Sequence, residues 1–233
     1  MNKTITVVVV VEGQTENAFV KEVLAPYWGQ RGIFVEAPVY RTQVDMRSGR
    51  VYKGGDIRFS RLEKQLRVFL KRRKDTIVAS FVDYYGIREW PGLDRITRGQ
   101  TPRDIALTLC DAAKRELALK YPENDVLNRF FPFFAIHEFE ALLFSDANVL
   151  STSLDIPLAI IEKTLNDCGS PEEIDNSPQT APSKRLDAWT NGFYRKTAKG
   201  ITIAQDIGID KMRRACPNFD FWLKSIETIQ TKE

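Results

Sequence analysis

Residues 5–16 have the sequence ITVVVVVEGQTE, an apolar run from Ile5 to Val11 that ends abruptly at Glu12 and Gly13. β-Branched side chains suit a pleated sheet, and an uninterrupted apolar run indicates a strand that is covered on both faces. Open α/β sheets bind their ligands beyond the carboxyl ends of such strands. Glu12 is therefore the first residue that we expect to carry chemistry.

Strands and helices alternate outward from this run. We expect further strands at 33–40, 76–82 and 130–136, and helices at 16–28, 60–74 and 101–121. Thr15 is the expected N-cap of the first helix, and the helix at 101–121 starts at Thr101 with a proline at an early position. The basic stretch 41–56 and the connection 84–100 are predicted loops. This alternation predicts an α/β fold, with a Rossmann-like, mostly parallel sheet and helices on both faces.

The pattern changes after Leu150, where helical segments at 157–167, 183–190 and 209–229 are separated by loops that contain Gly and Pro. No further strand is predicted there. We therefore expect an α/β core at 1–148 and a helical C-terminal extension, 149–233, packed on that core.

Composition excludes several classes of protein. The 233 residues are 43% hydrophobic and 28% charged, which is typical of a globular chain. The longest apolar run is far shorter than the ~20 residues of a membrane helix, and the N-terminus has no secretion leader. The three cysteines are an odd number and form no CxxC pair. We expect a cytoplasmic protein with no membrane association.

Basic residues are clustered although the net charge is only +3. They gather at 41–61, at 71–74, and late in the chain at Lys184, Arg185 and Lys199. Such clusters suit the phosphates of a nucleic acid, and binding through them would weaken steeply with salt. Alternatively, these basic residues lie in solvated loops, or at the C-termini of helices, where the helix dipole favours a cation.

Acidic residues recur where predicted strands end. Glu12 follows the first strand, Asp83 follows 76–82, and Glu138 and Glu140 follow 130–136. In a parallel sheet these ends share one edge, so the carboxylates can converge and repel each other unless a cation neutralises them. Their hard oxygens suit Mg²⁺ or Mn²⁺. Alternatively, Glu12 caps the following helix and Asp83 binds loop amides.

These residues carry a family resemblance. The order of apolar strand, Glu12-Gly13, helix, strand, helix, apolar strand and Asp83 resembles a Toprim domain, the metal-binding α/β domain of topoisomerases, primases and overcoming-lysogenization-defect (OLD) nucleases. More closely, the chain resembles an uncharacterised bacterial Toprim-like family, domain-of-unknown-function family 4276, often encoded beside ATPases in defence loci. The motifs that carry this likeness are VEGQTE at 11–16, FVDYYG at 81–86, HEFEALLF at 137–144, SKRL at 183–186, YRK at 194–196 and CPNF at 216–219.

The Toprim resemblance implies phosphodiester chemistry, with Mg²⁺ held by Glu12 and Asp83. Glu138 and Glu140 would complete the acidic site, and Lys196, or else Lys184 or Lys199, would contact phosphate. The chain departs from the pattern at Tyr85, where Toprim domains have a second aspartate. Glu89 and Asp94 are further candidates for the missing carboxylate. Glu138 and Glu140 share a face if their segment is extended and diverge if it is helical.

The resemblance therefore implies a metal-dependent nuclease in anti-phage defence, acting on DNA, tRNA or other RNA with an ATPase partner of AAA or ABC type. The opposing hypothesis, favoured by Tyr85, is a non-catalytic adaptor that binds an ATPase or nucleic acid. A nucleotide-binding enzyme has less support, because no P-loop or GxGxxG motif follows the first strand. The oligomeric state stays open, with a homo-oligomer among the alternatives.

Overall fold

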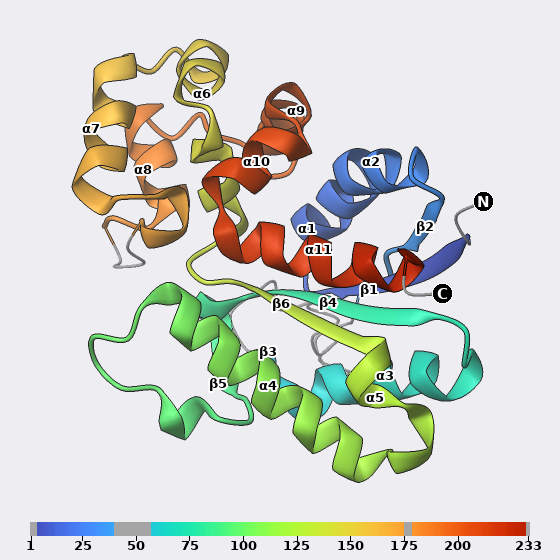
Figure 1. Ribbon diagram of the computed structural model, residues 1–233. Helices are drawn as coiled ribbons and strands as arrows, with labels where there is room; N and C mark the ends of the chain where they lie inside the picture. Colours follow the sequence, from blue (N-terminus) through green and yellow to red (C-terminus); the bar gives the residue numbers. More distant parts are fainter. Residues whose placement is uncertain (1–3, 40–56, 175–178, 232–233) are drawn as a thin grey trace, which may run out of the picture.

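The computed structural model describes residues 4–39, 57–174 and 179–231, and its centre is a parallel sheet (Figure 1). Four strands pair in the order β2-β1-β4-β6, and every neighbouring pair is parallel. Their bounds are Ile5–Val11 for β1, Ile33–Glu36 for β2, Ile77–Asp83 for β4 and Phe130–Ala135 for β6. The expected α/β architecture is thus confirmed.

The register of the strands aligns their carboxyl ends. Val11 of β1 pairs with Phe81 of β4, which in turn pairs with Phe133 of β6. Asp83 pairs with Ala135 at the last position of that ladder. Glu12, Asp83 and the segment after Ala135 therefore leave the sheet at the same edge.

The valines of β1 alternate between two hydrophobic cores. Val7, Val9 and Val11 lie in one core, while Val8 and Val10 lie in the other, and all five are fully buried. Side chains alternate across a strand, so a sheet covered on both faces needs an apolar residue at every position. This is why the run is uninterrupted.

One face of the sheet is covered by the first and last helices of the chain (Figure 1). The first is continuous over α1 (Gln14–Phe19), a π-helical segment η1 (Val20–Leu24) and α2 (Ala25–Gly29). The last is α11 (Pro217–Thr231). The rings of Phe133 and Trp222 stack with centroids 5.0 Å apart. Helix α11 is thus part of the hydrophobic core on this face of the sheet.

The opposite face is covered by α3 (Phe59–Arg72), α4 (Pro102–Lys120) and the short α5 (Val126–Arg129), with a 3-10 turn η4 (Pro122–Asn124) between the last two. Thr101 is the N-cap of α4, and its hydroxyl accepts a hydrogen bond from the Asp104 N–H group at 3.2 Å. The cluster at Arg41, Arg47, Arg50 and Lys53 and the loop expected at 41–56 lie outside the described residues, as does Tyr40 of the expected second strand.

The connection after β4 is more ordered than the loop that the sequence predicts. It contains 3-10 turns η2 (Tyr84–Gly86) and η3 (Leu93–Arg95), and β5 (Ile87–Glu89), which pairs in parallel with β3 (Ile57–Arg58). Trp90 is buried between Phe59 and Phe134, with ring centroids 5.1 and 4.8 Å away. This tryptophan pins the connection to the core.

The C-terminal part is helical, and no strand follows Ala135 among the described residues. It comprises η5 (Phe139–Ser145), α6 (Ala147–Leu154), α7 (Leu158–Cys168), η6 (Pro171–Glu173), α8 (Pro182–Trp189), α9 (Ala198–Ile207), α10 (Ile209–Ala215) and α11. The expected boundary at 148/149 falls inside α6. The expected single helix at 209–229 is wrong, because Pro217 ends one helix at Cys216 and begins the next. The sequence did not predict α9.

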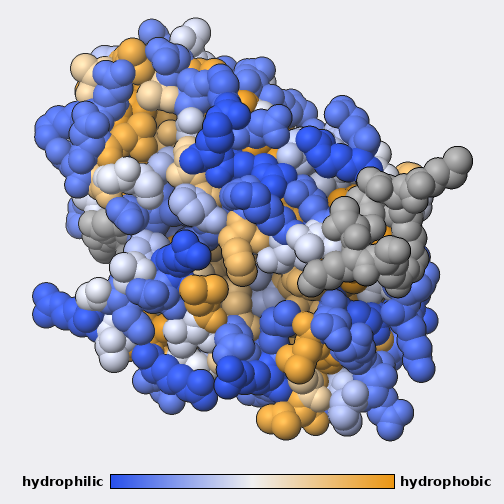
Figure 2. All heavy atoms as spheres, viewed as in Figure 1, coloured by the Kyte–Doolittle hydropathy of each residue, from blue (hydrophilic) through white to orange (hydrophobic). Residues whose placement is uncertain are grey.

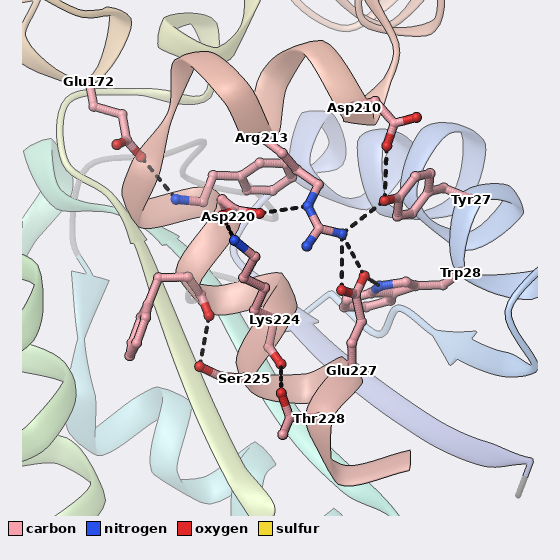
Figure 3. Close-up of polar contacts among 12 residues, drawn as sticks. Tyr27, Trp28, Glu172, Asp210, Arg213, Asp220, Lys224, Ser225, Glu227 and Thr228 are labelled. Carbon is pink, nitrogen blue, oxygen red and sulfur yellow. Dashed lines mark hydrogen bonds and ion pairs between the residues drawn. The ribbon is translucent and has the colours of Figure 1, made fainter. Parts of the chain in front are cut away.

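An ionic network joins the C-terminal helices to α2 (Figure 3). The Arg213 guanidinium contacts Asp220 at 2.7 Å and Glu227 at 2.8 Å, and donates to the Tyr27 hydroxyl at 2.8 Å. The Trp28 indole N–H also donates to Glu227, at 3.0 Å. Because Arg213 lies on α10 and its acidic partners on α11, the network fixes both helices against the first helix of the chain.

Polar residues dominate the surface on the side viewed in Figure 1. Figure 2 shows hydrophilic residues over most of this face, with hydrophobic residues in separate groups. Scattered exposed apolar residues are normal for a folded protein. Within the described residues, no helix combines the length and the apolar character needed to cross a membrane.

Candidate acidic site

Asp83 lies at the centre of the candidate site. It is the last residue of β4, and its side chain is 15% exposed. The Lys196 ammonium lies 3.8 Å from Oδ2 of this carboxylate. The other oxygen, Oδ1, is buried and has no hydrogen-bond partner within the described part of the chain. A buried carboxylate oxygen without a donor is costly, which makes Asp83 a candidate to bind a cation.

Glu140 and Lys196 form the closest ion pair of the site. The Lys196 Nζ atom lies 3.0 Å from Oε2 of Glu140, whose side chain is fully buried. The Tyr194 hydroxyl donates to Oε1 of the same carboxylate at 3.4 Å. The segment between α8 and α9 thus delivers both a cation and a hydroxyl to the acids at the sheet edge.

Glu12 and Glu16 approach the same place from the start of the first helix. Glu12 directly follows β1, and Gly13 is the N-cap of α1. The expectation that Thr15 caps this helix is wrong, because Thr15 lies inside α1. Glu16 is 5% exposed and folds back over Gly13, since a Cβ atom at residue 13 would lie only 2.6 Å from Oε2 of Glu16. The glycine therefore makes room for a buried carboxylate. The Thr15 hydroxyl lies 3.0 Å from that of Thr197, which ties this turn to the Lys196 segment.

The electrostatics of the site show that these groups act on one another. Burial, the charges of Glu16 and Glu12, and that of Glu140 raise the pKa of Asp83 well above its usual range, against the opposing charge of Lys196. Burial also raises the pKa of Glu140 to about 7, again against Lys196. One ammonium therefore does not compensate the four carboxylates.

Lys196 itself stays protonated. Burial lowers the pKa of its ammonium, but the charges of Glu140 and Asp83 outweigh burial, and the pKa is raised. The Lys196 side chain as a whole is 38% exposed, so the residue lies at the edge of the buried site. A fixed cation beside the acids is what stabilisation of a phosphate requires.

Glu138 has a different environment from Glu140. Its two carboxylate oxygens accept hydrogen bonds from the backbone N–H and the hydroxyl of Ser183, at 2.8 and 2.9 Å. The Glu138 backbone is extended, with φ −158° and ψ 162°, whereas Glu140 lies in the 3-10 turn η5. Because the backbone conformation changes between these two residues, the Glu138 side chain contacts Ser183 whereas the Glu140 side chain contacts Lys196. Glu138 serves the first turn of α8, where an anion is favoured.

The other candidates from the sequence form no hydrogen bond or ion pair with Glu140 or Lys196 within the described part of the chain. Glu89 accepts hydrogen bonds from the Ser60 N–H and hydroxyl groups, at 3.3 and 3.2 Å. Asp94 lies in η3, and the Tyr85 side chain is 57% exposed. The expected phosphate contacts Lys184 and Arg185 lie on α8, and Lys199 lies on α9.

Two residues of the site were missed by the sequence analysis. Glu16 could have been suspected, because a glutamate at the third position of a helix folds back toward the cap. Tyr194 lies in the YRK motif at 194–196 that carries the family resemblance, and this motif is the signal that could have placed it in the site beside Lys196.

A hard divalent cation is compatible with the chemistry of these donors. The site offers carboxylate oxygens, and one of them, Oδ1 of Asp83, is buried without a partner among the described residues. The side chains as placed do not surround one point, since no group of three or more His, Cys, Asp or Glu residues in the described ranges could already hold a metal ion.

The fold and the site together define an α/β protein with a carboxylate and lysine cluster at the carboxyl edge of a parallel sheet. The family model described as Domain of unknown function (DUF4276) matches residues 11–227, so the chain belongs to that family. This confirms the family to which the sequence motifs pointed. No curated protein and no solved structure matches the chain.

Proposed function

We propose that this protein is a Mg²⁺- or Mn²⁺-dependent phosphodiesterase of Toprim type that cleaves nucleic acid. The observation that carries the proposal is Asp83, whose buried Oδ1 has no partner among the described residues. The charges of Glu16, Glu12 and Glu140 act on the same carboxylate, and Lys196 lies 3.8 Å from its Oδ2. An excess of carboxylates around one such oxygen is the charge arrangement that a divalent cation relieves.

Asp83 and Glu12 would hold the cation, with Glu16 and Glu140 available around them. When bound, a divalent cation polarises a phosphoryl oxygen and lowers the pKa of a water molecule. Lys196 adds a positive charge for the phosphate group at the edge of the buried site. Tyr194 and Glu140 hold the Lys196 segment in place.

The test is a cleavage assay with plasmid, single-stranded DNA and total tRNA, in Mg²⁺ or Mn²⁺ and in EDTA. Asp83→Asn and Glu12→Gln should lose cleavage by at least about 100-fold. Glu63→Gln is the matched control, since Glu63 is also buried and paired with a lysine, Lys120, but lies on α3. Mn²⁺ binding, measured by calorimetry, should be lost in Asp83→Asn and kept in Glu63→Gln. Cleavage by Asp83→Asn at the wild-type rate would refute the proposal.

The setting of this activity is part of the same proposal. The family resemblance supports anti-phage defence in the bacterial cytoplasm and an ATPase partner, as an analogy. If the protein alone is inactive, an ATPase encoded beside its gene should therefore be added to the assay.

A second candidate function is a non-catalytic adaptor that binds an ATPase or nucleic acid. It is favoured by two observations: Lys196 already neutralises part of the acidic site, and Tyr85, in place of an aspartate, is exposed. Binding of nucleic acid or of the ATPase, without cleavage of any substrate in any metal, would favour the adaptor.

A further inference from the structure

A surface cavity of about 370 Å³, widely open to solvent, lies between the C-terminal ends of α6 and α8 and the start of α9. This is within the ~300–1,000 Å³ of typical small-molecule sites. Its wall combines aromatic, amide, hydroxyl and charged side chains, among them Trp189, Thr190, Asn191, Phe193, Lys199 and Asp155.

The aromatic side chains of this cavity offer surfaces for stacking. Trp189 is held by an edge contact with the buried ring of Phe144, with centroids 6.1 Å apart. Phe193 is 77% exposed, so little of its ring is used by the fold. It follows Asn191 and Gly192, which have φ values of 51° and 80°. This left-handed turn, which suits Asn and Gly, presents Phe193 at the cavity.

The polar groups of the cavity match a nucleotide. Lys199, on the first turn of α9, can bind a phosphate. The Asn191 amide and the Asp155 carboxylate can bind the edge of a base, since such groups pair with base amino and ring nitrogen atoms. A base that stacks on an aromatic ring while its phosphate meets a lysine is the usual arrangement in proteins that bind single strands.

The cavity is connected to the acidic site by one short segment. The Thr190 hydroxyl, in the cavity wall, accepts a hydrogen bond from the Tyr194 N–H group at 3.0 Å. Tyr194 donates to Glu140, and Lys196 pairs with the same carboxylate. The segment 190–196 therefore has the cavity at one end and the acids at the other.

We propose that this cavity binds one unpaired nucleotide of a single-stranded nucleic acid, with the base stacked on Phe193 and the phosphate at Lys199. The inference rests on the proposed nuclease function and assigns its substrate class, because a base paired and stacked in a duplex cannot enter the cavity. Nucleotide binding here is separate from cleavage at Asp83.

The test measures binding by fluorescence anisotropy, in EDTA so that no strand is cut. The probes are labelled single-stranded DNA and RNA of one sequence, the matching duplex, and free mononucleotides as competitors. Wild-type protein should bind a single strand more tightly than the duplex. Phe193→Ala should weaken single-strand binding by about 5- to 100-fold. Lys199→Met should reduce the slope of log affinity against log salt by about 0.7.

Phe221→Ala is the matched control, because Phe221 is 55% exposed on α11 and does not line the cavity. It should bind as the wild type does. Binding by Phe193→Ala at wild-type affinity, or equal affinity for duplex and single strand, would overturn the inference. Free nucleotides that bind as tightly as the strands would overturn the assignment to single strands. Phe193-dependent binding in EDTA, together with no cleavage in Mg²⁺ or Mn²⁺ even after the ATPase is added, would refute the nuclease proposal and leave the cavity assignment standing.

Discussion

The Lys196 ammonium lies 3.0 Å from the carboxylate of Glu140, and this contact joins the C-terminal helices to the edge of the parallel sheet. Glu140 is fully buried in the turn after β6, whereas Lys196 comes from the segment between α8 and α9. The candidate site is thus complete only when the C-terminal part has folded against the sheet.

Replacing Lys196 with Met should impair both the chemistry and the fold. Removal of one electrostatic stabiliser typically lowers turnover by about 10²–10³-fold. Leaving Glu140 buried without its cation should cost about 1–3 kcal/mol in the free energy of unfolding. Cleavage assays and urea denaturation measure the two effects.

The double variant Lys196→Met with Glu140→Gln separates these effects, because it removes the unpaired charge. It should recover most of the stability and none of the cleavage. Lys211→Met is a control, since Lys211 pairs with Asp146 instead. Normal cleavage by Lys196→Met would exclude the lysine from the mechanism.

The stability of the metal-free protein should depend on pH through Glu140. Burial raises the pKa of Glu140 from 4.5 to about 7, despite Lys196, so the folded state holds this proton more tightly than the unfolded state. The contribution of the Glu140 proton to the stability of the folded state is fully present below pH 4.5 and is lost as the pH rises through about 7. Relative to Glu140→Gln, the wild type should lose up to about 2–3 kcal/mol over this range.

Urea denaturation of both proteins in EDTA at several pH values checks this difference. Glu63→Gln is the control with the opposite sign. Burial of Glu63 is outweighed by hydrogen bonds from Lys120 and Tyr121, which lower its pKa from 4.5. The contribution of the Glu63 carboxylate to stability is therefore lost only as the pH falls. The difference in unfolding free energy between the wild type and Glu63→Gln should not change with pH above 4.5. If the difference in unfolding free energy between the wild type and Glu140→Gln did not change with pH, the prediction would be contradicted.

Gly13→Ala should reduce function with little effect on the fold. The backbone φ of −131° accepts alanine, so the loss of stability should be at most about 1 kcal/mol. The new Cβ atom would lie 2.6 Å from the Glu16 carboxylate and push it from the site. Displacing a supporting carboxylate should lower Mn²⁺ affinity or cleavage by about 10–100-fold. Gly29→Ala is the control, because nothing lies within 4 Å of its Cβ position.

Glu138→Ala should weaken the fold more than the chemistry. The Glu138 carboxylate accepts two hydrogen bonds from Ser183 at the start of α8, a role worth about 0.5–2 kcal/mol. Cleavage and Mn²⁺ binding should stay within a few-fold of the wild type. If both were lost as completely as in Asp83→Asn, Glu138 would be a metal ligand, as the sequence analysis predicted.

The sequence predicted the parallel sheet and the position of its acidic edge because these depend on local patterns. A run of five valines is buried on both faces wherever it lies in the sheet, and the residue after such a strand must emerge at the sheet edge. Caps such as Thr101 are local as well. The break at Pro217 was also readable from the chemistry of proline, although the prediction overlooked it.

What the sequence by itself determined is therefore the α/β framework, the family motifs and the edge at which Glu12 and Asp83 emerge. Only the tertiary structure decided which side chains meet there. It turned Glu138 toward Ser183 and Glu140 toward Lys196, and it brought Glu16 and Tyr194 into the site. The physical reason is that side-chain contacts between distant segments depend on packing and on the balance of burial and charge, which no local pattern encodes.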